Sequence, residues 1–160
     1  VGWGQALAEI QAPIGYDEYG YGFSNKNSKI FHCSRGYPVQ IENEASVIGC
    51  LLCIPDIELE ESNDTISAIK QKYPPLNFLT TYNVKQDILR NGSIQFYADG
   101  QHISCGRFEN IYRAKYFPTV SIFGDAKVVV RFNESQFTYP LPEGALPFEK
   151  VSNIAMREKQ

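Results

Sequence analysis

The sequence lacks a long hydrophobic run, an excess of basic residues and a cysteine framework, and each absence argues against one class of protein. No apolar stretch reaches the ~18 residues of a membrane-spanning helix, and no signal peptide opens the chain. A formal net charge of −3 gives no support for a nucleic-acid surface, which would show a basic stripe. The four cysteines lie in apolar segments without framework spacing, so we expect reduced thiols in an intracellular protein.

What the chain contains instead is a series of short apolar runs separated by turn residues, densest between residues 93 and 133. Ile94–Ile103 alternates apolar and polar residues on either side of an Asp-Gly pair, the strongest short-range hairpin signal. Tyr116–Phe123 and Lys127–Phe132 flank a Gly-Asp turn, which predicts a second hairpin. Short strands with such frequent turns predict an all-β sandwich of two antiparallel sheets.

The first third of the chain gives weaker signals of the same kind. Val1–Ile10 reads as a strand end followed by a loop, and Tyr21–Ser24 with Lys29–Cys33 predicts a hairpin across a polar turn. Arg35–Ala45 is predicted to be a loop. Val47–Ile54 is continuously apolar, which predicts a strand buried on both faces or nearly so.

Residues 56–91 break this pattern and predict a loop inserted into the sandwich. The segment starts with an acidic run, followed by a short helix from Asn63 or Asp64 to about Lys72 and a strand over Asn77–Val84. The acidic run could meet a basic partner such as a histone tail, although solvated loops more often carry such charges. We expect residues 1–142 to form one domain and 143–160 a tail.

The order of these motifs resembles a SPRY domain, and more narrowly that of the Ash-two subunit (Bre-two in yeasts) of COMPASS/MLL-type histone methyltransferases. The Asp-Gly hairpin Ile94–Ile103 followed by Tyr116–Pro118 is general to SPRY domains. Gly2-Trp3 followed by Gln11–Asp17, with the sequence Gln-Ala-Pro-Ile-Gly-Tyr-Asp, is specific to the Ash-two branch. The resemblance runs from Val1 to about Pro142, and its divergence within the insertion indicates a fungal member.

The resemblance implies a distorted two-sheet sandwich with a non-catalytic role in the nucleus and no cofactor. It implies binding of a WD-repeat subunit (the retinoblastoma-binding protein-five type, Swd-one in yeasts) that offers a short acidic segment. The pair would then help to activate the catalytic SET-domain subunit, which methylates histone H3 at lysine four. By the same resemblance, the helix that docks a Dpy-thirty-type dimer (Sdc-one in yeasts) follows Gln160, and the opening strands of the domain precede Val1.

Four residues are predicted to bind the partner. Pro13 and Tyr16 match the proline and tyrosine of the family's binding motif, whereas its first arginine would fall just before the chain starts. The second basic position aligns near Ser24, so Lys26 is the substitute, and Arg35 is a further basic candidate. A proline-stiffened loop carrying tyrosines suits an extended peptide, although tyrosines in a following strand can equally face the core.

Metal and catalytic sites are disfavoured on the same grounds. Cys50 and Cys53 have C-x-x-C spacing, but a strand points them to opposite faces and no second ligand pair follows. His32 and His102 lack a nucleophile with a plausible elbow, which favours histidines at a hairpin surface over acid–base groups. Two alternatives remain: a SPRY substrate-recognition module of a ubiquitin ligase or related adaptor, and a small hydrolase that uses a histidine.

Overall fold

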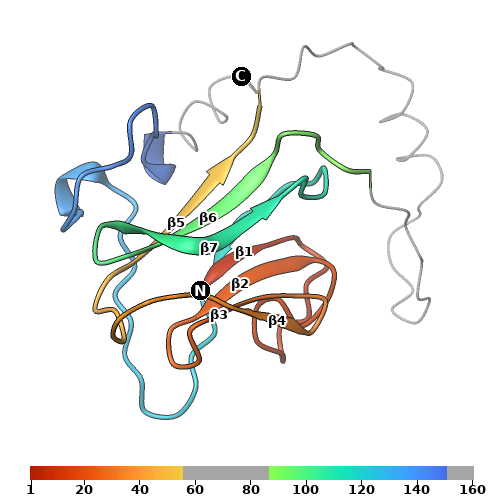
Figure 1. Cartoon of the computed structure of the whole chain (residues 1–160). Helices are drawn as coiled ribbons and strands as arrows, with labels where there is room; N and C mark the ends of the chain where they lie inside the picture. Colours follow the sequence, from red (N-terminus) through yellow and green to blue (C-terminus); the bar gives the residue numbers. More distant parts are fainter. Residues whose placement is uncertain (56–86, 151–160) are drawn as a thin grey trace.

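The computed structural model describes residues 1–55 and 87–150, and its architecture is two stacked β-layers (Figure 1). Within these residues no helix is long and apolar enough to cross a membrane. The strands are β1 (Gly2–Gly4), β2 (Gly20–Ser24), β3 (Lys29–His32), β4 (Arg35–Pro38), β5 (Ile48–Cys53), β6 (Ser93–Ala98), β7 (Gln101–Glu109) and β8 (Phe117–Thr119), with a short 3-10 helix η1 (Glu134–Gln136) near the end.

The strands form two sheets, so the predicted all-β sandwich is confirmed. One sheet has the order β4-β3-β2-β1-β8 and the other the order β5-β6-β7. Every pairing between neighbouring strands is antiparallel. β1 lies between β2 and β8, and therefore pairs the start of the chain with residues more than a hundred positions later.

The predicted Asp-Gly hairpin is the β6–β7 connection. Asp99 and Gly100 have φ values of 46° and 82°, as the tight turn requires. The Asp99 carboxylate also accepts hydrogen bonds from the backbone N–H groups of Val47 and Ser46, at 2.9 and 3.3 Å. One turn residue therefore also positions the chain that leads into β5.

Replacing Asp99 by alanine should lower the free energy of unfolding by about 2 kcal/mol. Alanine is strained at positive φ, and the two N–H groups of residues 46 and 47 lose their acceptor. Urea denaturation checks this as a lower midpoint with an unchanged slope. Asp99→Asn is the matched control, because asparagine tolerates this φ and keeps one acceptor oxygen; an equal loss in both variants would contradict the explanation.

The core lies between the sheets and is built mainly from their facing apolar side chains. Ile94 and Phe96 of β6 are fully buried, and Phe23 and Ile30 oppose them from the five-stranded sheet. The rings of Phe23 and Phe96 lie 5.7 Å apart, which joins the layers directly. Leu89, inside the predicted insertion, is also buried, and Ile88 forms a bridge with Tyr112.

Three sequence expectations are wrong. Arg35–Pro38 is not loop but strand β4, paired along its length with β3. The strand predicted over Val47–Ile54 is not buried on both faces: β5 forms there, but all six of its residues are only partly buried. The second hairpin does not form: only Phe117–Thr119 is a strand, and it pairs with β1, while Lys127–Phe132 belongs to no strand.

The chain directly after β8 is attached to the N-terminal loop. The Ser121 hydroxyl oxygen accepts a hydrogen bond from the Ile14 backbone N–H at 2.9 Å, which attaches this stretch to the N-terminal loop. The strands predicted at the first residues and at 21–33 are confirmed by β1 and by the β2–β3 hairpin. The helix expected to Lys72 and the strand expected over Asn77–Val84 lie outside the described residues.

Candidate partner-binding site

The loop Gln5–Tyr19, which connects β1 to β2, is fixed by hydrogen bonds from both ends. The Gln5 N–H donates to the Tyr19 carbonyl at 2.8 Å and closes its base. The carbonyls of Gly15 and Asp17 accept the N–H groups of Ser34 and Cys33, at 3.0 and 3.1 Å. The loop therefore lies on the β3–β4 turn and has a defined shape.

Side-chain hydrogen bonds, from within the loop and from the β3–β4 turn, hold the same loop. The Asp17 carboxylate accepts hydrogen bonds from the N–H groups of Glu9, at 2.6 Å, and Tyr19, at 2.9 Å. The Ser34 hydroxyl donates to the Tyr16 carbonyl at 2.5 Å. Because the backbone is already ordered, little conformational entropy remains to be lost when a partner binds.

This fixed loop presents apolar side chains to solvent. Tyr16 is 58% exposed and Pro13 is also exposed, so the two predicted anchors lie on one loop. Leu7 and Ile10 are 66% and 94% exposed on the same loop, and the sequence reasoning missed them. The available signal was their position: both fall where the sequence predicts a loop, and apolar residues in a loop have no sheet face to occupy.

Among the charged groups around the loop, the Arg35 guanidinium is the one that favours contact with a carboxylate. The carboxylates of Asp17 and Glu9 accept backbone N–H groups from within the loop. Arg35 follows the β3–β4 turn directly and is exposed, with no ion pair to any described residue. Burial and, to a smaller extent, the Glu18 carboxylate raise the pKa of the Cys33 thiol, and the Arg35 guanidinium acts in the opposite direction.

The structure separates Lys26 from the other predicted site residues. Lys26 lies in the β2–β3 turn, whereas Tyr16 and Arg35 lie at the β3–β4 turn, at the opposite end of β3. The four residues of β3 correspond to roughly 13 Å at ~3.3 Å per residue. Pro13, Tyr16 and Arg35 thus form one candidate site, and Lys26 would need a partner that extends along β3.

Tyr21 and His32 belong to the core side of this region. Tyr21 is 4% exposed, and its ring stacks on the His32 ring with centroids 4.1 Å apart. The Tyr21 hydroxyl oxygen accepts the Tyr112 N–H at 3.2 Å, and burial raises its pKa. His32 Nδ1 lies 2.8 Å from the Gly20 carbonyl. These contacts fit a structural role for both residues.

The cysteines do not form a metal site within the described residues. Cys50 packs against the core, and burial raises the pKa of its thiol to about 12, so the thiol stays protonated. The Sγ of Cys53 lies on the other face of β5 and accepts a hydrogen bond from Gln95 Nε2 at 3.7 Å. No group of three or more His, Cys, Asp or Glu side chains that could hold a metal occurs in the part of the chain described.

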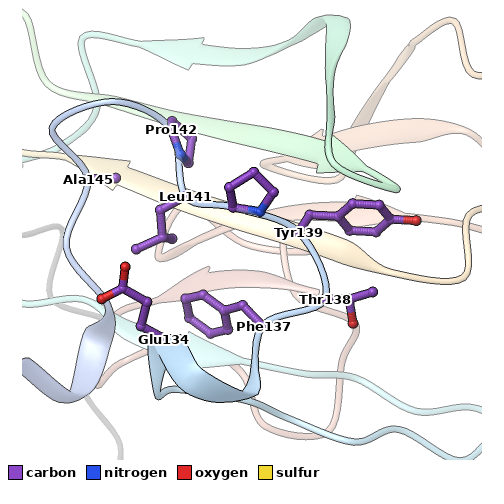
Figure 2. Close-up of a pocket in the computed structure, with 8 residues that line it drawn as sticks. Glu134, Phe137, Thr138, Tyr139, Leu141, Pro142 and Ala145 are labelled. Atoms are coloured by element: carbon purple, nitrogen blue, oxygen red, sulfur yellow. The ribbon is translucent and has the colours of Figure 1, made fainter.

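An open hollow of about 370 Å³ lies near the C-terminal end of the described residues (Figure 2). All its lining residues come from one segment, Glu134–Ala145, with Phe137, Tyr139 and Leu141 among them. Glu134 carries the only carboxylate in the lining. An acid–base pair is absent from this lining, so the hollow offers no evident catalytic chemistry.

The ordered loop Gln5–Tyr19 places an exposed tyrosine near an exposed arginine, two residue types that are enriched at the hot spots of protein–protein interfaces. No protein-family model matches the chain. The chain is 30% identical over 168 residues to the Set1/Ash2 histone methyltransferase complex subunit ash-2 of Caenorhabditis elegans. The matched region covers 91% of this chain and 28% of that subunit. It is 31% identical over 152 residues to the subunit ASH2 of the corresponding Drosophila melanogaster complex, covering 88% of this chain and 26% of that subunit.

These similarities confirm the predicted resemblance to the Ash-two subunits of histone methyltransferase complexes. The chain spans about a quarter of the length of the curated relatives it matches. The narrower assignment to SPRY domains stays a prediction, as do the domain bounds 1–142 and 143–160.

Proposed function

We propose that this chain is a non-catalytic binding module of a COMPASS-type histone H3 lysine-four methyltransferase complex in the nucleus. Both relatives carry names of histone methyltransferase complex subunits, which favours this function over the ubiquitin-ligase and hydrolase alternatives. The single observation that carries the mechanism is the fixed loop Gln5–Tyr19, with Pro13 and Tyr16 exposed beside Arg35.

The partner contact follows from the chemistry of this loop. The Tyr16 ring supplies apolar area together with a polar tip, and Pro13 keeps the backbone beside it rigid. Arg35 can form a bidentate contact with a carboxylate. A short acidic segment of a WD-repeat subunit, with an apolar residue next to its carboxylate, matches both features.

Activation of the SET-domain subunit would then be a population shift. The bound pair stabilises the active arrangement of that subunit and performs no chemistry itself. A Dpy-thirty-type dimer is proposed to bind through residues beyond 160.

Tyr16→Ala should weaken binding of the acidic segment of the WD-repeat subunit by about 1–3 kcal/mol, which is roughly 5- to 150-fold in Kd. The reason is loss of an exposed aromatic anchor on a loop whose backbone contacts are unchanged. Calorimetric titration of the chain with that segment measures the effect, and a thermal melt confirms the fold. Tyr16→Phe is the matched control and should retain most of the affinity.

The charge contribution is tested with two basic residues at opposite ends of β3. Arg35→Ala should weaken binding and reduce its dependence on salt, because one charge-assisted contact is lost. Lys26→Ala reports whether the partner also extends along β3. Unchanged affinity for both Tyr16→Ala and Arg35→Ala would reject this loop as the binding site.

A further inference from the structure

Ser34, in the turn between β3 and β4, donates two hydrogen bonds to the loop that carries Tyr16. Its backbone N–H donates to the Gly15 carbonyl at 3.0 Å, and its hydroxyl donates to the Tyr16 carbonyl at 2.5 Å. The neighbouring Cys33 N–H donates to the Asp17 carbonyl at 3.1 Å. Two consecutive residues of the turn therefore hold three consecutive carbonyls of the loop.

The middle one of these three contacts is the one that depends on a side chain. The other two use backbone N–H groups, which every residue except proline supplies. Removal of the Ser34 hydroxyl should therefore leave the loop attached to the turn and release the Tyr16 carbonyl alone. Because Ser34 and Tyr16 are both exposed, water can replace the hydroxyl, and no buried group loses its partner.

The direction of the Tyr16 ring depends on the two peptide planes on either side of its Cα, because each plane is rigid. The first plane contains the Gly15 carbonyl, which accepts the Ser34 N–H. It also contains the Tyr16 N–H, which donates to the Pro13 carbonyl at 3.0 Å. The second plane contains the Tyr16 carbonyl, which the Ser34 hydroxyl holds. This hydroxyl thus completes the constraint on an exposed ring.

The Ser34 hydroxyl also joins Tyr16 to Arg35. Arg35 follows Ser34 directly, so their Cα atoms lie about 3.8 Å apart across a trans peptide bond. Arg35 is the first residue of β4, and its backbone is paired with His32 of β3. One side-chain contact, between residues 18 positions apart, therefore links the tyrosine to the strand that carries the arginine.

We propose that Ser34 is a positioning residue of the partner-binding site. Its hydroxyl orients the Tyr16 ring relative to the Arg35 guanidinium, so that one acidic segment contacts both. The inference rests on the function proposed for the loop Gln5–Tyr19, and it names the residue that sets the spacing between the two contacts.

Ser34→Ala should raise the Kd for the acidic segment of the WD-repeat subunit about three- to tenfold, measured by calorimetric titration of the chain. Alanine keeps the Cβ at the same φ of 60°, so the variant lacks only the hydroxyl. A second measurement needs no partner. The NMR order parameter of the Asp17 N–H, which shares a peptide plane with the Tyr16 carbonyl, should fall from about 0.85 toward about 0.6.

Ser34→Gly separates positioning from stability. Glycine also lacks the hydroxyl, but it adopts positive φ without strain, so this variant should unfold at a higher urea concentration than Ser34→Ala. Both variants should nevertheless bind at least threefold more weakly than the wild type. Recovery of wild-type affinity in Ser34→Gly would overturn the proposal, because affinity would then follow stability and not the hydroxyl.

Ser28→Ala is the matched control. Ser28 also has a positive φ, 49°, but it lies in the turn at the other end of β3, so affinity and the Asp17 order parameter should stay unchanged. If Tyr16→Ala weakens binding but Ser34→Ala does not, the role of Ser34 is rejected and the proposed function stands. An unchanged order parameter in Ser34→Ala would also reject that role. Absence of binding by the wild-type chain would overturn the proposed function, and this inference with it.

Discussion

Gly15→Ala should lower the free energy of unfolding by about 3 kcal/mol and also weaken partner binding. Gly15 has φ +91°, which strains an alanine by ~1–3 kcal/mol, and a Cβ there would collide with the Phe31 carbonyl. Relief of the collision would lift the loop from the β3–β4 turn, where the Gly15 carbonyl accepts the Ser34 N–H. Urea denaturation and titration with the acidic segment measure the two losses.

The matched control is Gly124→Ala. Gly124 also has a positive φ, +65°, but nothing lies within 4 Å of the position that a Cβ would take there, so only the backbone strain applies. We expect a smaller loss of stability, about 1 kcal/mol, and unchanged binding of the acidic segment. Equal losses in the two variants would show that the Phe31 contact does not hold the loop.

Phe96→Ala should destabilise the fold by about 3–5 kcal/mol, the second large expected effect. Phe96 is 0% exposed, and its ring packs against Phe23 of the opposite sheet, so truncation leaves a cavity between the layers. A marginally stable domain would be largely unfolded by a loss of this size at 37 °C. Chemical denaturation measures it directly.

Phe96→Leu is the control variant against which the loss of stability in Phe96→Ala is compared. Leucine keeps most of the apolar volume, so the loss should be well under half of that for alanine. If Phe96→Ala costs less than about 1 kcal/mol, the region between the sheets is not the tightly packed core described above.

Local turn chemistry explains which parts of the fold the sequence predicted. Asp99-Gly100 specifies its hairpin through residues that tolerate positive φ, and this signal needs no distant partner. β4 carries no such signal, because all four of its residues are exposed and it becomes a strand only by pairing with β3. The pairing of β8 with β1 depends on contacts across the whole chain, which a local pattern cannot reveal.

The candidate site was predictable to a similar extent. The motif identified Pro13 and Tyr16, and both are exposed on the loop where a partner can reach them. Arg35 lies near them because of the β3–β4 turn. The sequence carries no glycine signal for that turn, since its residues Cys33 and Ser34 adopt positive φ. Leu7 and Ile10 were missed because apolar residues normally indicate a core, and only the fold shows that these do not face it.

The hydrogen bond between Ile14 and Ser121 has a consequence for synthesis. It joins residues 107 positions apart, so the loop that carries Tyr16 stays without this anchor until the ribosome has released residue 121 and β8 has paired with β1. Contacts of such high sequence separation form late and slowly. The loop therefore reaches its final, fully anchored form only after most of the chain has been synthesised, although its contacts with the β3–β4 turn can form earlier.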